Sequence, residues 1–336
     1  MFQPVTTLDL PAQTIAELQS RGFHFIEDVL NSEDALRKIG LKKAELEKRL
    51  KIPHIAALDL WEYEKKRQKI GVCCLDLEAM LDDGFNCGVI TEISGAPYTG
   101  KTQICMQLCI SVQLNELYSG LNGRAIYIDT RSGASITRFK ELIKGYNNFF
   151  GKIVLEESEV LKNIQLLSPS SLDEFLEAIS YLKEAVDISF NGKQVKVIII
   201  DSLSMPIICS IDDPSIRPIY FSKVLHDLNY IAIKHDIAVR SISNPQTLFN
   251  EKTFYVTLVI FQLLKIVITN EIVTHSDKDG NSSYASAGGH YVSEVVFNKL
   301  ESTRISDDKF AIRLLKSPIM PEISVTFLVG INIIYI

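Results

Sequence analysis

The residues best suited to chemistry form one run of eight, Gly95-Ala96-Pro97-Tyr98-Thr99-Gly100-Lys101-Thr102. This run fits the pattern G-x-x-x-x-G-K-[ST], in which glycines let backbone N–H groups converge on phosphate oxygens. In that pattern Lys101 supplies a positive charge, and the Thr102 hydroxyl is placed to ligate Mg²⁺. The pattern also arises by chance, and its glycines then form only a turn between core elements.

The residues around this run decide between the two interpretations. A β-branched run, Gly88–Ile93, precedes it and predicts a strand. After it, Ile104, Leu108 and Val112 recur at helical spacing and predict a helix that continues to Leu117. A strand, a glycine-rich loop and a helix N-terminus place a phosphate at the positive end of the helix dipole. We therefore expect the chain to bind a nucleoside triphosphate, ATP, together with Mg²⁺.

An acidic residue further along the chain supports the same chemistry. The apolar run Val195–Ile200 predicts a buried strand, and it ends in Asp201. In phosphate-loop proteins, an aspartate that follows such a strand helps to hold Mg²⁺. Many buried strands end in aspartate, so the position gains its meaning from the loop at Gly95. We expect Lys101, Thr102 and Asp201 to lie together, with Thr102 and Asp201 at the metal.

Composition limits the class of protein. The chain has 336 residues, of which 46% are hydrophobic, enough for one large α/β domain and a small second one. A formal net charge of −6 argues against a broad nucleic-acid-binding surface and leaves room for a local basic loop. The six cysteines form no C-x-x-C pair, and the six histidines lack the spacing of a zinc site.

The chain shows no signature of secretion or membrane insertion. Met1–Pro4 lacks the features of a signal peptide, and Gln262 and Lys265 interrupt the most apolar window, residues 254–269. We therefore expect a soluble protein with reduced thiols, in the nucleus or the cytoplasm, and no membrane partner.

Three parts follow one another along the chain. Residues 1–52 predict short helices, at Pro11–Ser20, after Ser32 and at Lys42–Leu50, that pack as a small bundle. Residues 53–70 predict a charged linker. Residues 71–336 alternate apolar strands and helices, which is typical of an α/β core.

The third part predicts a mostly parallel sheet. Strands are predicted at Val89–Ser94, Ala125–Asp129, Ile164–Leu167, Val195–Asp201 and Ile266–Asn270. Helices are predicted between them, at 136–145, 171–185 and 219–235. Runs that are apolar at every position are typical of parallel strands buried on both faces. Alternating segments near 293–300, 309–316 and 323–328 predict antiparallel strands that extend the sheet.

Taken together, these motifs resemble the RecA-type strand-exchange recombinases of eukaryotes and archaea. The segments that carry the resemblance are Leu75-Asp76, Gly88–Ile93, Gly100–Gln103, Ala125–Thr130, Ile268–Asn270 and Ser317-Pro318. The run Gly100–Leu108 is most similar to the C-type recombinase paralogue, a subunit of mediator complexes. The resemblance covers nearly the whole chain. It implies a RecA-like phosphate-loop ATPase core and a small N-terminal helical domain of the helix-hairpin-helix kind.

The resemblance also implies a function. It implies ATP binding in homologous-recombination repair of DNA double-strand breaks, extending to meiotic recombination. The chain would act in the nucleus, within a hetero-oligomer of recombinase paralogues, on single-stranded or branched DNA. The resemblance places Asn270 at the nucleotide, in an Asn-Gln switch that senses the γ-phosphate, and Arg217 near the first DNA-binding loop.

Two more segments bear on assembly. The run Lys316-Ser317-Pro318 is similar to the family's cap on a neighbour's nucleotide, although Lys316 stands where that cap often carries an acid. Filament-forming relatives carry a Phe-x-x-Ala handle in the linker, and this chain has His54-Ile55-Ala56-Ala57. The difference favours hetero-complexes over self-polymerisation.

Two positions at the site depart from the family pattern. Arg131 stands where the family places a glutamate that positions the attacking water. An arginine cannot act as a general base, and losing such a group costs about 10²–10⁴ in rate. Glu271 replaces the glutamine of the switch and adds negative charge near a triphosphate. We therefore expect ATP binding with slow DNA-dependent hydrolysis, and weak coupling to the barely basic second DNA loop, Val273–Gly289.

The segment 240–265 is anomalous. Without it, Ile237-Ala238-Val239 would continue directly into Ile266–Asn270 as one apolar strand. The segment carries an apolar run, Phe254–Leu264, that has no obvious place in a packed core. We hypothesise a translated intron or an alternative splice product, which would also explain the apolar end, Val329–Ile336. The alternative is a genuine insertion that forms a surface hairpin.

Two other functions stay open. The first is an interaction subunit, in which nucleotide stabilises the fold without turnover. The second is a different phosphate-loop enzyme, such as a small-molecule kinase. The long parallel core and the lack of an arginine-rich lid disfavour the kinase.

Overall fold

The computed structural model describes residues 5, 12–30, 32–39, 56–65, 68–86, 88–242, 265–276, 282–329 and 334–335. The chain forms two compact units, Met1–Glu62 and Tyr63–Ile336. The division between them falls inside the predicted linker. The predicted domain limits, 1–52 and 71–336, stay predictions.

The first unit is helical. Its helices are α1 (Ala12–Ser20), α2 (Ile26–Leu30) and α3 (Glu33–Ile39), and α5 (Ala57–Lys65) crosses the division between the units. Its apolar core consists of Val5, Leu18, Ile26, Val29 and Ala35. The Ser32 hydroxyl accepts a hydrogen bond from the Ala35 amide at 3.3 Å, as a residue that caps a helix N-terminus does. The first two predicted helices are confirmed, and the third, Lys42–Leu50, lies outside the described residues.

The second unit is built on a large sheet. Its described strands are β3 (Ile90–Gly95), β4 (Arg124–Asp129), β5 (Ile164–Leu167), β6 (Val195–Asp201), β7 (Lys265–Ser276), β8 (Ser282–Ser286), β9 (Asn298–Arg304), β10 (Lys309–Lys316), β11 (Ser324–Val329) and β12 (Ile334–Tyr335). They follow the order β12-β11-β10-β9-β3-β7-β6-β4-β5, with β8 paired to β7. A separate pair joins β1 (Lys69–Ile70) to β2 (Phe85–Asn86).

The sheet is parallel in its centre and antiparallel towards the C-terminus, as predicted. Strands β5, β4, β6, β7, β3 and β9 pair with their neighbours in parallel. Strands β9, β10, β11 and β12 then pair antiparallel. The first strand of the C-terminal group, β9, is therefore parallel to β3 and antiparallel to β10.

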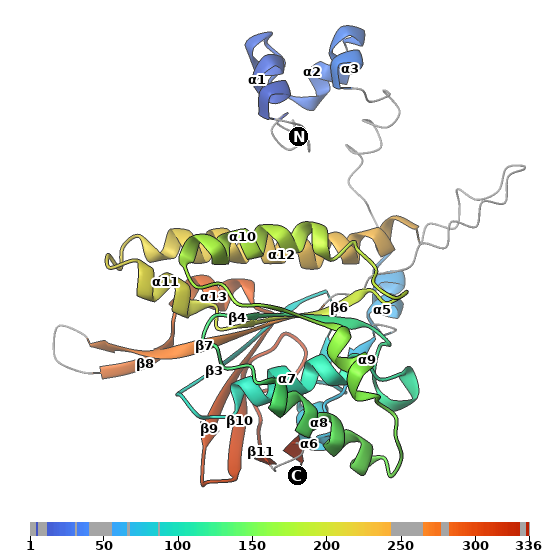
Figure 1. Ribbon diagram of the computed structural model, residues 1–336. Helices are drawn as coiled ribbons and strands as arrows, with labels where there is room; N and C mark the ends of the chain where they lie inside the picture. The colour runs from blue at the N-terminus through green and yellow to red at the C-terminus, as the bar shows by residue number, and fades with distance from the viewer. Residues whose placement is uncertain are drawn as a thin grey trace, which may run out of the picture. The chain divides into compact units, whose positions relative to one another are not determined.

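Helices cover both faces of this sheet (Figure 1). On one face lie α7 (Lys101–Ser111), α8 (Ile136–Phe149) and α9 (Glu157–Lys162), and on the other lie α10 (Leu172–Ala185) and α12 (Arg217–Ile242). Shorter elements are α6 (Leu75–Met80), the 3₁₀ turn η2 (Glu116–Tyr118), α11 (Ser204–Ser210) and α13 (Gly289–Val295).

Strand β6 shows why its central run, Val197–Ile200, is apolar at every position. Val197 and Ile199 pack into the core that contains α7 and α8. Ile198 and Ile200 pack into the core that contains α10 and α12. Because successive side chains point to opposite faces, a strand covered on both sides needs apolar residues throughout.

The sequence predictions were wrong at two places. Helix α7 ends at Ser111 rather than Leu117, which lies exposed on η2. Residues 293–295 belong to α13, and the strand starts at Asn298. Short apolar runs fit either period, so the sequence alone placed both boundaries wrongly. In this chain, which contains segment 240–265, Ile237-Ala238-Val239 lies in α12.

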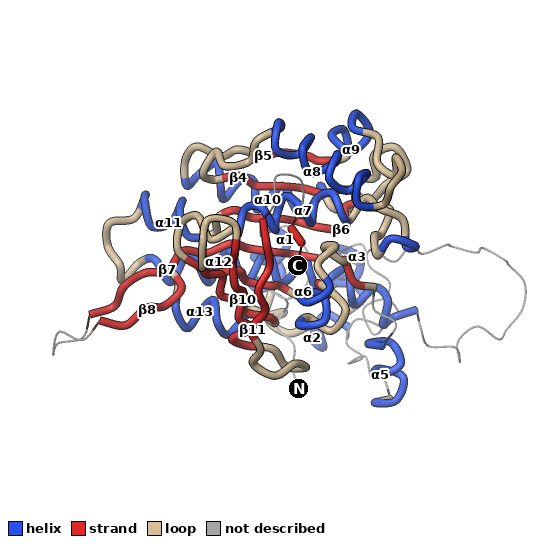
Figure 2. Tube along the Cα trace, turned by 90° about the horizontal axis from the view of Figure 1, so that it is seen from below, coloured by secondary structure: helices blue, strands red, loops and turns tan. Residues whose placement is uncertain are grey.

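The carboxyl ends of the central strands bring distant residues together. Asp129 at the end of β4 pairs with Asp201 at the end of β6. Gly95 at the end of β3 pairs with Glu271 of β7. Beyond Glu271, β7 pairs with β8 in an antiparallel hairpin (Figure 2). Its pairing begins where Ile272 lies opposite Ser286 and ends where Ser276 lies opposite Ser282. The predicted second loop therefore contains an antiparallel hairpin.

Candidate nucleotide-binding site

The phosphate-loop lysine is buried and turned onto its own loop. The Lys101 ammonium donates hydrogen bonds to the carbonyl oxygens of Gly95 at 2.7 Å and of Ala96 at 2.8 Å. Burial lowers the pKa of Lys101, while the carboxylates of Glu271 and Asp201 act to raise it. A buried ammonium with only carbonyl oxygens in hydrogen-bond contact is suited to receiving an anionic ligand.

Close packing against β9 fixes the shape of the loop. A Cβ atom on Gly95 would lie 2.4 Å from the Ser302 carbonyl oxygen, so only glycine fits there. The Ser302 hydroxyl donates to the Thr99 carbonyl oxygen at 2.5 Å. Gly100 has a φ of 89°, in the left-handed region that favours glycine. Between the glycines, Ala96, Pro97 and Tyr98 form an exposed turn.

The first turn of α7 offers unpaired backbone donors. Gly100 precedes this helix, and no side chain caps the N-terminus. The first N–H groups of a helix have no partner within the helix, and they lie at the positive end of its dipole. These groups and Lys101 fit a chain of phosphates.

Thr102 and Asp201 lie together, as the sequence predicts. The Thr102 hydroxyl donates to Asp201 Oδ2 at 2.7 Å, and the buried Tyr127 hydroxyl donates to the same oxygen at 2.8 Å. The Thr269 hydroxyl donates to Asp201 Oδ1. The sequence analysis missed Tyr127 and Thr269. Their signal is their place in β4 and β7, the two strands that flank β6.

This arrangement suits Mg²⁺ that is shared with a ligand. Among the described residues, no group of three His, Cys, Asp or Glu side chains is placed to hold a metal ion. Mg²⁺ is commonly bound through one or two protein oxygens, with phosphate and water completing the octahedron. The Thr102 hydroxyl and the Asp201 carboxylate fit that role beside the loop.

Asp129 organises the loop that carries Arg131. Its Oδ1 accepts hydrogen bonds from the amides of Arg131 and Gly133, both at 3.1 Å. Its Oδ2 accepts one from the Ala134 amide at 2.8 Å. This second acid is therefore occupied by backbone donors and fixes the position of the residue that follows β4.

The two departures from the family pattern form an ion pair. The Arg131 guanidinium donates to Glu271 Oε1, and Glu271 Oε2 lies 3.9 Å from the Lys101 ammonium. The Glu271 side chain is only 14% exposed, against 38% for Arg131. The Glu271 carboxylate thus contacts the Arg131 guanidinium on one side and lies near the Lys101 ammonium on the other.

Asn270 is buried beside the site. Its amide nitrogen donates to Glu92 Oε1 at 2.9 Å and to the Ala287 carbonyl oxygen at 2.5 Å. The other Glu92 oxygen lies 3.5 Å from the Lys299 ammonium. In the structure Asn270 therefore braces β7 against β3 and the segment before α13, and its contact with nucleotide stays a prediction.

Two predicted contact residues are engaged elsewhere in the chain. The Arg217 guanidinium donates to the carbonyl oxygens of Ile211 at 2.9 Å and Ile208 at 3.4 Å. The Lys316 ammonium donates to the carbonyl oxygens of Ser293 at 2.5 Å and Val296 at 2.8 Å, at the C-terminal end of α13. The roles of Arg217 at DNA and of Lys316 at a neighbour's nucleotide stay predictions.

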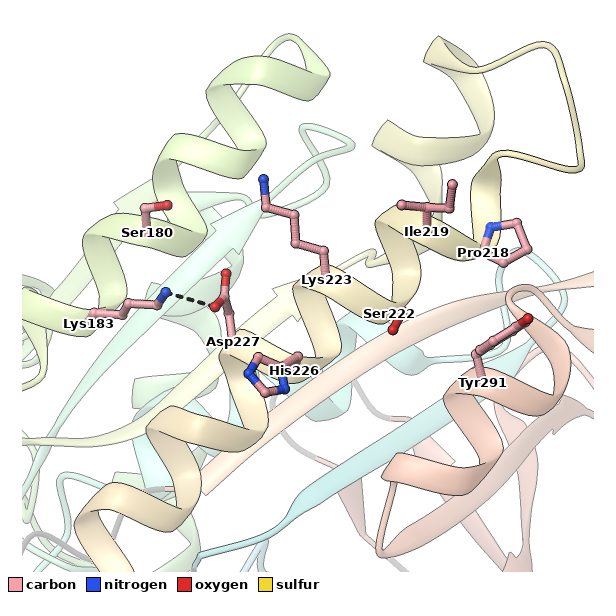
Figure 3. A pocket seen from close by; sticks show the side chains of 9 residues that line it. All are labelled: Ser180, Lys183, Pro218, Ile219, Ser222, Lys223, His226, Asp227 and Tyr291. Atoms are coloured by element: carbon pink, nitrogen blue, oxygen red, sulfur yellow. Dashed lines mark hydrogen bonds and ion pairs between the residues drawn. The ribbon is translucent and has the colours of Figure 1, made fainter. Parts of the chain in front are cut away.

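A groove of about 750 Å³ lies apart from these residues, along α10, α12 and α13 (Figure 3). Its lining consists of Ser180, Lys183, Pro218, Ile219, Ser222, Lys223, His226, Asp227 and Tyr291. Lys183 and Asp227 form an ion pair at 2.7 Å across it. The groove contains no residue of the phosphate loop.

Comparison with known proteins gives the family. A Rad51 family profile matches residues 65–252, more than half of the chain. The chain belongs to the Rad51 family. The match ends inside the anomalous segment 240–265. The resemblance to RecA-type recombinases is thereby confirmed.

Two relatives of this Rad51-family chain show how far the similarity extends. The DNA repair and recombination protein RadA of Metallosphaera sedula is 24% identical over 274 residues, which cover 81% of this chain and 73% of RadA. The DNA repair protein RAD51 homolog 3 of Cricetulus griseus is 26% identical over 271 residues, which cover 71% of this chain and 74% of that protein. The assignment to the C-type branch stays a prediction.

None of the helices that the structure describes combines the length and the apolar character that crossing a membrane requires.

Proposed function

We propose that the chain binds ATP and Mg²⁺ between the Gly95–Thr102 loop and Asp201. The observation that carries this proposal is the direct contact of Thr102 with Asp201, 99 positions apart, beside the buried ammonium of Lys101. The first-turn amides of α7 and Lys101 would hold the phosphates. Thr102 and Asp201 would hold Mg²⁺, which supplies charge neutralisation at the phosphates when it is bound.

Hydrolysis is proposed to be slow. The carboxylates of Asp201, Asp129 and Glu271, which lie around the loop, are already engaged. Asp201 accepts from three hydroxyls, Asp129 accepts from three amides, and Glu271 pairs with Arg131 and Lys101. A general base must be free to take a proton from the attacking water. Arg131, at the family's glutamate position, cannot do so.

The biological role follows from the family. We infer a recombinase paralogue that acts in homologous-recombination repair of DNA double-strand breaks, including meiotic recombination, in the nucleus. It would be one subunit of a hetero-oligomeric mediator complex with other paralogues on single-stranded or branched DNA. The Rad51 profile and the two relatives named for DNA repair support this proposal.

A second candidate is a nucleotide-binding interaction subunit without DNA-dependent ATPase activity. The ion pair between Arg131 and Glu271 favours it, because both departures remove parts of a hydrolysis mechanism and leave the phosphate loop intact.

Nucleotide binding and turnover, measured with and without single-stranded DNA, separate the two candidates. The comparison uses the wild type and Lys101→Ala. DNA-stimulated turnover that Lys101→Ala abolishes supports the recombinase paralogue. Tight ATP binding without turnover supports the interaction subunit, and no binding by the wild type contradicts both. Co-purification of the tagged chain from its own cells then tests whether other recombinase paralogues are its partners.

A further inference from the structure

The ion pair between Arg131 and Glu271 joins two residues 140 positions apart. The resemblance to the recombinases implies a glutamate and a glutamine at these two positions. Arg131 follows β4 and Glu271 lies in β7, so the pair spans the end of β6, which lies between them. The side chains of Arg131 and Glu271 therefore neutralise each other's charge. The contact lies beside Lys101, at the position where a nucleotide's last phosphates would meet the protein.

Glu271 offsets part of the positive charge at this point. Glu271 contacts Arg131 through one carboxylate oxygen and lies 3.9 Å from Lys101 through the other. The side chains of Lys101 and Glu271 are 7% and 14% exposed, so water screens their interaction weakly. An anion that enters beside Lys101 meets a carboxylate that already interacts with the same ammonium.

We propose that Glu271 is an internal competitor for the terminal phosphate of a triphosphate, and so sets the preference of the site between ATP and ADP. This inference rests on the proposed nucleotide site. The lysine of a phosphate loop reaches the β- and γ-phosphates. A γ-phosphate therefore has to displace the Glu271 carboxylate from Lys101, and it gains Arg131 as a partner when it does so. A diphosphate lacks the group that competes most directly, and leaves the pair with Arg131 in place.

The backbone of Glu271 links this exchange to the hairpin of β7 and β8. The Glu271 amide donates to Asn270 Oδ1 at 3.1 Å, and its carbonyl oxygen accepts from the Ala287 amide at 2.7 Å. The next residue, Ile272, begins the pairing with β8 at Ser286. Displacement of the Glu271 side chain therefore acts at the base of the hairpin, where amide hydrogen exchange reports it.

The test measures affinity for two probes, Mg²⁺ with ADP and Mg²⁺ with a non-hydrolysable ATP analogue. Glu271→Gln keeps the side-chain shape and removes the charge. We expect it to raise affinity for the analogue about tenfold and for ADP less than about threefold, the order expected for one nearby charge. Arg131→Gln leaves the carboxylate without its main partner, so it should change the analogue-to-ADP ratio in the opposite direction.

The matched control is Glu322→Gln. Glu322 pairs with Arg313 at 2.9 Å on the exposed side of β10, so this variant removes the same charge from the same kind of pair elsewhere. It should leave the ratio unchanged.

The possible outcomes are distinct. The proposal is supported when the analogue-to-ADP affinity ratio shifts in opposite directions in the two variants. It also requires that the analogue, and not ADP, changes amide hydrogen exchange at residues 271–272. An unchanged ratio in both variants, with nucleotide still bound, overturns it and leaves the nucleotide site standing. Should Glu271→Gln fail to fold, an unchanged ratio in Arg131→Gln alone overturns it. Absence of nucleotide binding by the wild type overturns the site and this inference together.

Discussion

The double variant Arg131→Glu with Glu271→Gln installs the two residue types that the resemblance to the recombinases implies at these positions. It places a carboxylate within the loop fixed by Asp129 and removes the acid that would repel it. A correctly placed general base contributes about 10²–10⁴ in rate, so we expect ATP turnover to rise towards that range. The change uses the backbone position that the structure already provides.

The single variant Arg131→Glu should behave differently, because it leaves two carboxylates where the ion pair was. Two unit charges 4 Å apart interact by about 4 kcal/mol at an effective dielectric constant of 20. The Arg131 side chain is 38% exposed, and solvent screening reduces this value to about 1–3 kcal/mol. At about 2–4 °C per kcal/mol for a large domain, the melting temperature should fall by several degrees. The double variant should recover most of this loss.

The assay combines thermal unfolding with steady-state phosphate release, with and without single-stranded DNA. The wild type, both single variants and the double variant are compared, and Lys101→Ala supplies the background. Two results would refute the reasoning. One is an Arg131→Glu variant as stable as the double variant, which would show that the ion pair has no energetic role. The other is a folded double variant that binds ATP and hydrolyses it no faster than the wild type.

Three further predictions follow from the same structure. Lys101→Ala should lower ATP affinity about 10- to 100-fold, the value of one or two charged hydrogen bonds, and the ATP-induced rise in melting temperature should disappear. Gly95→Ala should destabilise the unit and abolish nucleotide binding, because its Cβ would lie 2.4 Å from a backbone oxygen of β9. Gly133→Ala should do neither, because the atom nearest to its Cβ would lie 3.9 Å away. Thermal unfolding with and without nucleotide compares the two variants. Burial raises the pKa of Cys73 to about 12, so its thiol stays protonated at pH 8 and should be alkylated far more slowly than that of exposed Cys209. The alkylation rate of Cys73 should rise with pH until the pH reaches about 12. Peptide mass spectrometry after iodoacetamide treatment measures both rates, and equal rates at pH 8 would contradict the burial of Cys73.

Much of the core was predictable because its elements carry strong local signals. The bounds of β5 and β6 match the predicted Ile164–Leu167 and Val195–Asp201. In β6 the signal is the apolar run Val197–Ile200, which is typical of a strand covered on both faces. The errors lie where a short apolar run borders a helix. Residues 112–117 lie beyond the end of α7, and residues 293–295 form the end of α13. Three residues carry too little periodicity to separate the two states.

The residue types that form the site were predictable from the sequence, and the side-chain partners of those residues were not. Parallel strands place their carboxyl ends at one edge, which is why Thr102 and Asp201 could be expected to meet. Tyr127 and Thr269 could not be assigned to Asp201, because their contacts depend on the register between β4, β6 and β7. The contact between Arg131 and Glu271 also depends on register. The signal that the sequence offered for this contact was the opposite charge of Arg131 and Glu271, the two residues that differ from the types implied by the resemblance.

The charged groups at the phosphate loop differ from Arg131 and Glu271 in what holds them. A buried ammonium and a buried carboxylate are costly to keep unless other groups satisfy them. Here Lys101 is held by two carbonyl oxygens and Asp201 by three hydroxyls, so the groups expected to bind phosphate and Mg²⁺ remain fully supported. The changes fall on Arg131 and Glu271, and each of these neutralises the other. An ion pair beside a fully supported phosphate loop favours a subunit that binds nucleotide and hydrolyses it slowly.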